Sequence, residues 1–186
     1  MTAALENEHN STPKRHGKIK AAVIIFGLLV ITTCVMIYLF SSQDATESSM
    51  TSGRFTELLK KIFFPKFDEL TYAEQYALRE KMSLIVRKGA HFSEYLLLAT
   101  FSFHLLYALP RPRTDVMCAL CAFVFAAVFA MTDEYHQSFV PGRAMAARDV
   151  LIDSLGALFG VFLALRIKRI AEKRRERRKK NNADPK

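Results

Sequence analysis

Side chains able to do chemistry are concentrated in residues 131–156, near the end of the chain. This stretch holds Asp, Glu, His, Gln and Arg beside the turn-forming pair Pro141 and Gly142, and apolar sequence lies on both sides of it. Polar groups at that density are costly between two membrane-like segments unless they meet partners. We therefore predict that this stretch forms one wall of a polar site at the surface of a membrane-embedded helix bundle.

A second polar group precedes another apolar segment, where Lys88, His91 and Glu94 recur at intervals of three residues. Residues three or four apart lie on one face of a helix, so these side chains share a face. Asp149 and Asp153 share a helix face in the same way. Asp153 is expected about one turn below the membrane interface, where a carboxylate needs a cationic partner or a proton.

The predicted site joins these two groups. Arg143 directly follows the turn signal Pro141-Gly142, so it is placed to fold back over the other polar residues. The site residues that we predict are Arg87, Lys88, His91, Glu94, Asp133, Glu134, His136, Gln137, Arg143, Asp149 and Asp153.

A metal site is one chemistry that these residue types allow, since His and carboxylate side chains together bind Zn, Fe or Mn. The sequence contains no H-E-x-x-H motif and no paired E-x-x-H motif. We therefore predict no metal and no cofactor. If a metal were bound, its ligands would come from His91, Glu94, Asp133, Glu134, His136, Asp149 and Asp153.

Hydrolysis or group transfer is a second possibility. Glu94 or Asp133 would act as the general base, and Arg87, Lys88 and Arg143 would hold an anionic substrate. No G-x-S-x-G motif marks a nucleophilic serine. Binding without catalysis demands less, because Arg grips phosphate or carboxylate in a bidentate way and the other side chains hydrogen-bond hydroxyls or amides. The residue types leave open whether the protein is an enzyme.

Four apolar segments must position these residues. Residues 21–40 carry no charge and would extend about 30 Å as a helix, which is enough to cross the hydrocarbon of a bilayer. Short links join the last three segments, as in an antiparallel bundle. We predict an all-α, polytopic membrane protein with an antiparallel bundle of four transmembrane helices, spanning about residues 20–40, 88–109, 115–132 and 149–165.

The distribution of positive charge predicts the orientation. Lys and Arg precede the first span, occur in the link 110–113 and dominate the tail 167–186, so these parts are expected on the cytoplasmic side. Both termini would then be cytoplasmic in a plasma-membrane protein, and residues 1–18 would form a disordered arm. The polar clusters of all four spans would meet at the outer face. Interhelical hydrogen bonding alone does not explain why the acids and histidines gather at that face.

An outer segment is predicted between the first two spans, over residues 41–87. Residues 55–64 alternate apolar and basic side chains, which is typical of an amphipathic helix on a membrane surface, and Pro65 ends it. Thr71 and Glu74 have the spacing of a capping box. The helix that begins there is expected to run unbroken into the second span.

Charge and cysteine content argue against a nucleic-acid partner and against redox or metal chemistry at the C-x-x-C pair. From residue 166 onward the chain has eleven Lys or Arg and three Asp or Glu, so most of the net charge of +9 belongs to the tail. Beside a membrane exit this basicity favours anionic inner-leaflet lipid as the partner, and we predict no nucleic acid. Cys118 and Cys121 form a C-x-x-C pair, but within an apolar segment we interpret them as packing residues.

Four motifs resemble the VanZ family of small membrane proteins. They are F-S-S-Q at 40–43, R-K-G-A-H-F-S-E-Y at 87–95, T-D-E-Y-H-Q-S-F-V-P-G-R at 132–143 and R-D-V-L-I-D-S-L-G at 148–156, and the resemblance covers about residues 27–166. Asp153 stands where many members have Asn. The family is named for a protein that lowers sensitivity to teicoplanin without remaking the peptidoglycan precursor terminus. The resemblance implies a membrane and cell-envelope context.

We therefore predict an outward-facing polar pocket that binds an amphiphilic or lipid-linked envelope molecule. A lipid-linked wall intermediate or a lipoglycopeptide is the expected ligand, because teicoplanin carries an acyl chain, and lowered sensitivity to such drugs would follow. The alternative is a membrane-embedded hydrolase or transferase acting on a lipid-linked glycan or phosphate. A transporter is less favoured, because the polar groups cluster on one side only. The expected partners are the bilayer and this ligand, and the sequence leaves the oligomeric state open.

Overall fold

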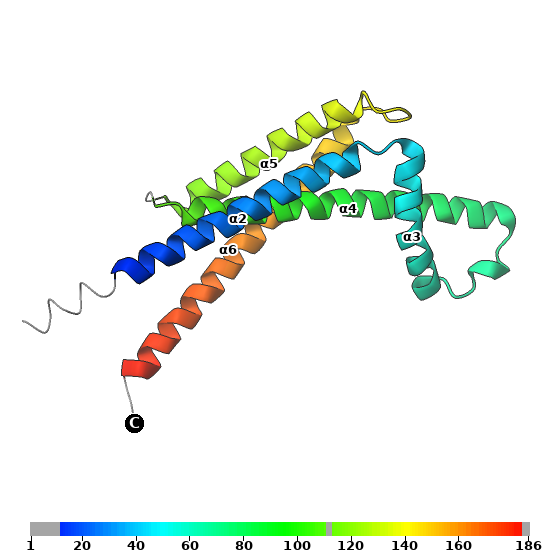
Figure 1. Cartoon of the computed structure of the whole chain (residues 1–186). Helices are drawn as coiled ribbons and strands as arrows, with labels where there is room; N and C mark the ends of the chain where they lie inside the picture. The colour runs from blue at the N-terminus through cyan, green and yellow to red at the C-terminus, as the bar shows by residue number, and fades with distance from the viewer. Residues whose placement is uncertain (1–11, 111–112, 184–186) are drawn as a thin grey trace, which may run out of the picture.

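The computed structural model describes residues 12–110 and 113–183, with side chains omitted at 12–20, 45, 54 and 183. The described residues are almost all helical and contain no strand (Figure 1). The elements are α2 (Thr12–Ser41), α3 (Ala45–Phe63), the short 3-10 helix η1 (Phe67–Glu69), α4 (Tyr72–Ala108), α5 (Asp115–Gln137) and α6 (Ala147–Ala183).

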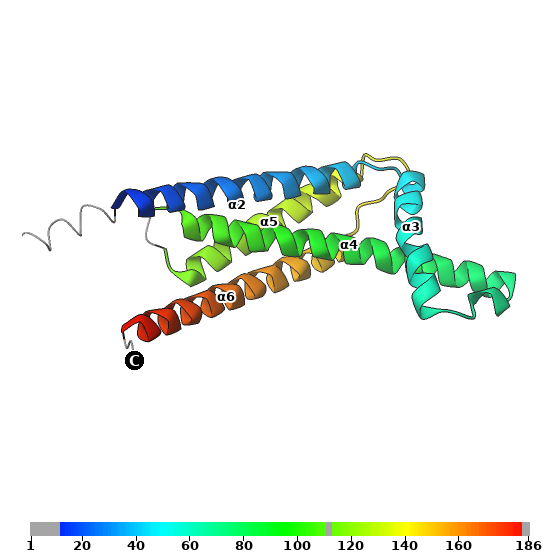
Figure 2. The ribbon, with the colours of Figure 1, turned by 60° about the horizontal axis from the view of Figure 1, so that its bottom comes forward.

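Helix α4 is the central element of the fold. It packs against α2, α3, α5 and α6 (Figure 2). Helices α2, α5 and α6 surround its second half, and α3 lies across the bundle near the end of α2. The first half of α4 extends beyond α3, away from the other long helices. A residue in the middle of α4 is therefore positioned by several helices at once.

Small side chains form the core of the bundle. On α5, Cys118, Ala122, Ala126 and Ala130 recur at intervals of four residues, and all are fully buried. The facing part of α6 contributes Ala157, Val161 and Ala164. Small residues in such stripes let helix backbones approach closely, which is how helices without a strong hydrophobic drive between them associate in a membrane.

The closest approach in the fold is between α4 and α6. A Cβ atom added to Gly156 would collide with the backbone carbonyl of Phe92, and one added to Gly160 would collide with that of Leu96. The hydroxyl of Thr100 donates a hydrogen bond to the carbonyl of Gly160 at 3.0 Å, across the same contact. The G-x-x-x-G spacing of α6 thus fixes how α4 and α6 are rotated toward each other.

Three helices in the described part of the chain are long and apolar enough to cross a membrane. They lie at Ala21–Ser41, Asp115–Gln137 and Ala147–Asn182. The predicted span 88–109 is not among them. It contains Lys88, Glu94 and two histidines, which lower its apolar character, although its helical conformation is as predicted.

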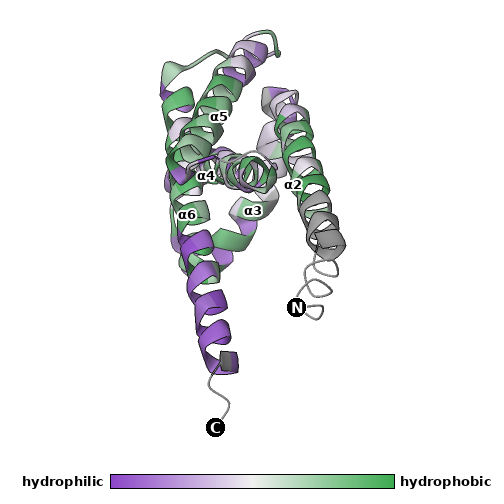
Figure 3. Cartoon of the chain, turned by 90° about the vertical axis from the view of Figure 1, so that its left-hand side faces the viewer, coloured by the Kyte–Doolittle hydropathy of each residue, from purple (hydrophilic) through white to green (hydrophobic). Residues whose placement is uncertain are grey.

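The hydropathy of the helices changes along α6. Its first half is apolar and its last turns are strongly hydrophilic, whereas α2 and α5 are mainly apolar (Figure 3). Many large apolar side chains of the bundle point outward, among them Ile24, Leu28, Leu120, Phe159 and Phe162. Such outward-facing apolar surface suits a lipid environment.

Helix α3 buries its polar side and exposes its apolar side. Ser48, Ser52 and Thr56, spaced by four residues, are buried, and Ser52 lies within hydrogen-bonding distance of Ser83 on α4, 3.0 Å between the hydroxyl oxygens. Apolar side chains on the same helix, including Phe55 and Ile62, are exposed. This is the reverse of a helix on a water-soluble core and is consistent with an amphipathic helix at a membrane surface.

Local sequence signals set most helix ends as predicted. Thr71 and Glu74 form a complete capping box at the start of α4, which then runs unbroken through Lys88. Helix α3 ends at Phe63, just before Pro65. The C-x-x-C pair does not act together: Cys118 is buried, Cys121 is exposed, and both are free.

Two helices extend beyond the predicted spans. Helix α2 begins at Thr12, so the stretch 12–18 of the predicted disordered arm is helical, whereas residues 1–11 lie outside the described residues. Pro13 is compatible with this, because proline is tolerated in the first turn of a helix. The predicted tail 167–186 continues α6 as far as Ala183, since its Lys, Arg and Glu residues favour helix. Residues 111 and 112 of the predicted cytoplasmic link and 184–186 of the tail also lie outside the described residues.

Candidate functional site

A polar cavity of about 220 Å³ lies between α4, the loop after α5 and the start of α6. Charged side chains from these three elements dominate its walls. Its lining consists of Leu84, Arg87, Lys88, His91, Gln137, Gly142, Arg143, Ala144, Arg148, Asp149, Ile152 and Asp153. The structure thus brings together seven of the residues predicted from the sequence: Arg87, Lys88, His91, Gln137, Arg143, Asp149 and Asp153.

The loop after α5 turns back over the cavity, as its sequence predicted. Gly142 has a φ of 73°, a left-handed conformation that glycine adopts without strain. Arg143 then reaches the end of α2 and the start of α3, where it donates hydrogen bonds to the Ser41 carbonyl (3.4 Å) and the Ser48 hydroxyl (2.9 Å). The guanidinium group is therefore held in place by neutral acceptors and forms no ion pair with a described residue.

Positive charge is in excess at the mouth of the cavity. Lys88 forms an ion pair with Asp149, which joins α4 to α6. Arg87, Arg143 and Arg148 have no ion-pair partner among the described residues. Burial lowers the pKa of the Arg143 guanidinium below its usual value, and the nearby charge of Arg87 adds to this effect. An arginine in such a setting stays charged, and an anion bound beside it would compensate that charge.

A second cavity of about 290 Å³ adjoins the first. The two cavities share Arg87, His91 and Arg143, and most of the surface of the second is apolar, with Phe40 and Phe55 in its wall. Glu94, which does not line the polar cavity, lies in the wall of this one. The site as a whole is therefore amphipathic: a cationic compartment opens beside an apolar one.

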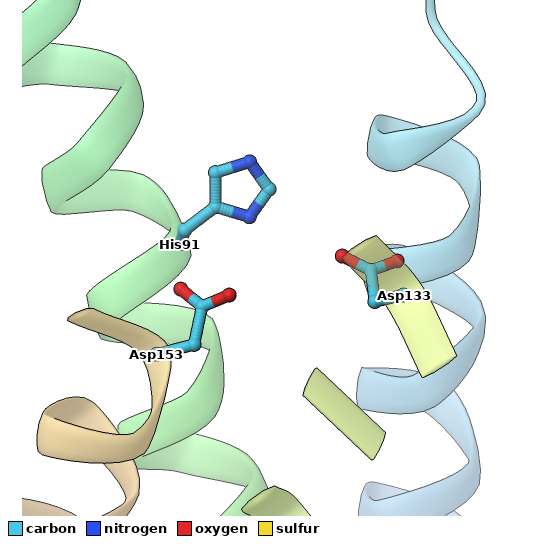
Figure 4. Close-up of side chains that lie close together, drawn as sticks. All are labelled: His91, Asp133 and Asp153. Carbon is cyan, nitrogen blue, oxygen red and sulfur yellow. The ribbon is translucent and has the colours of Figure 1, made fainter. Parts of the chain in front are cut away.

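Three side chains from three different helices meet at the inner end of the site. His91 comes from α4, Asp133 from α5 and Asp153 from α6, and they face a common space (Figure 4). One donor atom from each lies within 4.8 Å of the others. Asp133 and Asp153 are buried, so two carboxylates approach each other in an environment that screens their charges weakly.

Asp133 is fixed by two donors. The hydroxyl of Ser41, the last residue of α2, donates to its Oδ2 at 2.8 Å, and the side-chain amide of Gln137 donates to the same oxygen at 2.9 Å. The Gln137 amide also donates to the Ser41 hydroxyl at 3.2 Å. This network ties the ends of α2 and α5 together and orients the Asp133 carboxylate toward the site.

His91 and Glu94 lie side by side without a hydrogen bond. Their nearest atoms, Nδ1 and Oε2, are 3.5 Å apart. Both atoms are buried and make no hydrogen bond to any described residue. The predicted helix face is therefore real, but its two titratable groups are not satisfied by each other.

Like Asp133, two further predicted site residues line neither cavity and have structural contacts instead. Glu134 is buried and accepts a hydrogen bond from the backbone N–H of Ala146 at 2.9 Å, which anchors the loop that leads into α6. His136 stacks on Tyr38, with ring centroids 5.0 Å apart, and its Nε2 lies 3.2 Å from the Ser42 hydroxyl. These contacts hold the end of α5 against α2.

Sequence reasoning missed three polar residues of the site. Arg148 lines the polar cavity, Ser41 holds Asp133, and Ser48 holds Arg143. A signal existed for Arg148, which directly precedes Asp149 in the polar stretch. Ser41 lies in the F-S-S-Q motif, but the motif does not reveal its distant partner Asp133, and no local pattern distinguishes Ser48 from other serines.

The fold and the site define a class of protein: a small, helical protein with helices long and apolar enough to span a membrane, and with an ionisable pocket between helix ends. A family model described as VanZ/LLP1 matches residues 26–169, which is most of the chain. The chain therefore belongs to the VanZ-like family, and the resemblance noted in its motifs is confirmed. A search of curated proteins and a search of solved structures each gave no significant match.

Proposed function

We propose that this VanZ-like protein binds an amphiphilic or lipid-linked envelope molecule whose head is anionic. The head would occupy the polar cavity and the acyl chain would occupy the apolar cavity beside it. The observation that carries this proposal is the shared wall of Arg87, His91 and Arg143, which joins a cationic compartment to an apolar one. An amphiphile is the kind of molecule that has both parts.

The charges at the mouth support an anionic head. Three arginines line the polar cavity without an ion-pair partner in the described part of the chain, and the guanidinium group suits bidentate contact with phosphate or carboxylate. The single lysine there is already paired with Asp149. A bound anion would pair with arginines that form no ion pair with a described residue.

The membrane arrangement that we propose has four antiparallel spans in the plasma membrane, formed by α2, the second half of α4, α5 and α6. The second half of α4 would be the span added to the three apolar ones, because its polar residues face the site and the neighbouring helices rather than lipid. The site would face outward. The basic end of α6 would place the C-terminus in the cytoplasm, with the N-terminus on the same side.

Membership of the family suggests a biological consequence. A protein that binds an acylated envelope molecule at the outer face would intercept a lipoglycopeptide or shield a lipid-linked wall intermediate. Lowered sensitivity to teicoplanin-type drugs would follow from either event. Either event would require only the amphipathic site and its outward orientation, with no covalent change to the ligand.

A second function, a membrane-embedded hydrolase or transferase, is favoured by one observation. His91 Nδ1 and Glu94 Oε2 are buried and unsatisfied; both residues line the apolar cavity, and His91 also lines the polar one. General acid–base groups are often found in such a state before substrate arrives. A lipid-linked glycan or phosphate would be the substrate of this alternative.

The test is the lipid content of purified protein. Full-length wild type and an Arg143→Ala variant would be extracted in a mild detergent, and the retained lipids would be measured by mass spectrometry against the membrane extract. Arg169→Ala is the matched control, because Arg169 is exposed on α6 outside both cavities. We expect wild type and Arg169→Ala to enrich the same anionic amphiphile and Arg143→Ala to lose most of that enrichment.

The outcomes separate the two functions. Identical lipid profiles for all three proteins would contradict the binding proposal. If the wild type instead converts an enriched lipid-linked substrate into product, and Glu94→Gln stops the conversion while retaining the lipid, the protein is an enzyme. If Glu94→Gln and wild type retain the same lipid unchanged, binding alone is the function.

A further inference from the structure

We propose that His91, Asp133 and Asp153 bind a divalent transition-metal cation of the Zn²⁺, Mn²⁺ or Fe²⁺ class at the inner end of the polar cavity. The family match does not assign such a site, and the sequence alone predicted no metal. The inference rests on the three side chains in Figure 4 and on their unsatisfied surroundings. It does not depend on the identity of the amphiphile.

The donor set matches the chemistry of these cations. One imidazole nitrogen and two carboxylate oxygens suit Zn²⁺, Mn²⁺ and Fe²⁺. Ligands about 2.0–2.2 Å from a tetrahedral ion are about 3.3–3.6 Å apart. The atoms here lie within 4.8 Å of one another, so side-chain rotation would have to bring them closer by roughly 1 Å. The ends of α2, α5 and α6 and the middle of α4 are already packed around this space.

Burial and missing partners provide an independent reason. Asp153 is 2% exposed and has no hydrogen-bond or ion-pair partner among the described residues. Its side chain points at His91 and Asp133 (Figure 4). An unpaired carboxylate at this depth is costly, because a charge buried without a partner loses its hydration. A neutral imidazole, two carboxylates and one divalent cation together have no net charge.

Tyr95 adds a second unsatisfied group beside the cluster. It lies one helical turn after His91 on α4 and is 0% exposed, and its hydroxyl has no hydrogen-bond partner among the described residues. A hydrated cation at the cluster would supply the missing partner, because a metal-bound water can hydrogen-bond a tyrosine hydroxyl.

The surrounding shell is organised as expected for a metal site. Asp133 is oriented by Ser41 and Gln137, which both donate hydrogen bonds to its Oδ2. Its Oδ1 is left to coordinate the metal ion. Three protein ligands would leave coordination positions free toward the cavity. These positions lie on the side from which the arginines would hold an anionic head.

The experiment is metal binding by the full chain in detergent micelles. Protein stripped with a chelator would be titrated with Zn²⁺ or Mn²⁺, and the retained metal would be measured by mass spectrometry after gel filtration. We expect the wild type to retain about one ion per chain and Asp153→Asn to lose at least about tenfold in affinity, as expected for loss of a ligand. Asp149→Asn is the matched control, since Asp149 lines the same cavity but pairs with Lys88.

A second variant covers the case in which Asp153→Asn fails to fold. With Co²⁺ as the probe, wild type should show a visible absorption band that is weakened or shifted in His91→Gln. Wild type that retains no stoichiometric metal would overturn the proposal, as would equal binding by Asp153→Asn and Asp149→Asn. Arg143→Ala should keep the metal while losing the lipid, so failure here is distinguishable from failure of the proposed function.

Discussion

The hydroxyl of Ser41 donates a hydrogen bond to the carboxylate of Asp133, 2.8 Å away and 92 residues further along the chain. Ser41 is the last residue of α2 and is 0% exposed, and Asp133 lies one turn before the end of α5. The contact sets the depth of α2 relative to α5. The F-S-S-Q motif thus belongs to the site in two ways: Ser41 holds Asp133, and Phe40 and Gln43 line the apolar cavity.

Removal of this donor is the first prediction. In Ser41→Ala, Asp133 keeps only the Gln137 amide, and a buried acceptor that loses a partner costs about 1–3 kcal/mol. We expect the free energy of unfolding in mixed micelles to fall by about that amount. Thr132→Ala is the control, because Thr132 is exposed and its hydroxyl donates to the carbonyl of Phe129 in its own helix. Equal effects of the two variants would contradict the role given to Ser41.

The glycine contact between α4 and α6 gives a second prediction. Gly156→Ala places a methyl group against the Phe92 carbonyl, so the helices must separate, at a cost of about 1–3 kcal/mol for overpacking. His91 and Asp153 lie on the separated helices, so ligand retention should fall with stability. A chain that melts normally and retains its ligand would rule out this packing.

Gly89→Ala is the matched control on α4. A Cβ atom there meets nothing within 4 Å. Because alanine has a higher helix propensity than glycine, we expect the free energy of unfolding to rise by about 0.5–1 kcal/mol, measured by thermal denaturation. Destabilisation by Gly89→Ala would mean that this side of α4 is covered in the membrane.

The number of spans is the third prediction. Tyr72 is 86% exposed at the start of α4, and Val116 is 77% exposed at the start of α5, so a cysteine at either position should be reachable by a thiol reagent. With Cys34, Cys118 and Cys121 replaced, four spans require Tyr72→Cys and Val116→Cys to react from opposite sides of intact cells or vesicles. Labelling from the same side would show that α4 does not cross.

The ion pair at the mouth of the cavity gives a fourth prediction. Lys88 and Asp149 are both partly exposed, so solvent weakens their attraction, and a double-mutant cycle with Lys88→Met and Asp149→Asn should give a coupling of at most about 1 kcal/mol. The pair of Lys66 and Glu69, 3.9 Å apart and well exposed, should give almost none. Coupling above about 3 kcal/mol would mean that the cavity mouth is closed to water.

The sequence by itself determined the local features of the protein. The capping box at Thr71, the helix stop before Pro65 and the turn at Gly142 are set by neighbouring residues, so local chemistry is enough to predict them. Hydropathy predicted α2, α5 and α6 as spans. The spacing of the charged residues also predicted that most of them would share one region, because residues at one end of a span lie at one depth.

Only the tertiary structure decided how each helix is rotated, and therefore what each polar side chain does. Rotation is fixed by contacts between distant segments, above all the approach of Gly156 and Gly160 to α4. That packing turns Asp153 toward His91, while Glu134 anchors the loop before α6 instead of lining a cavity. Sequence spacing gives the depth of a residue along its helix, but its direction depends on partners far away in the chain.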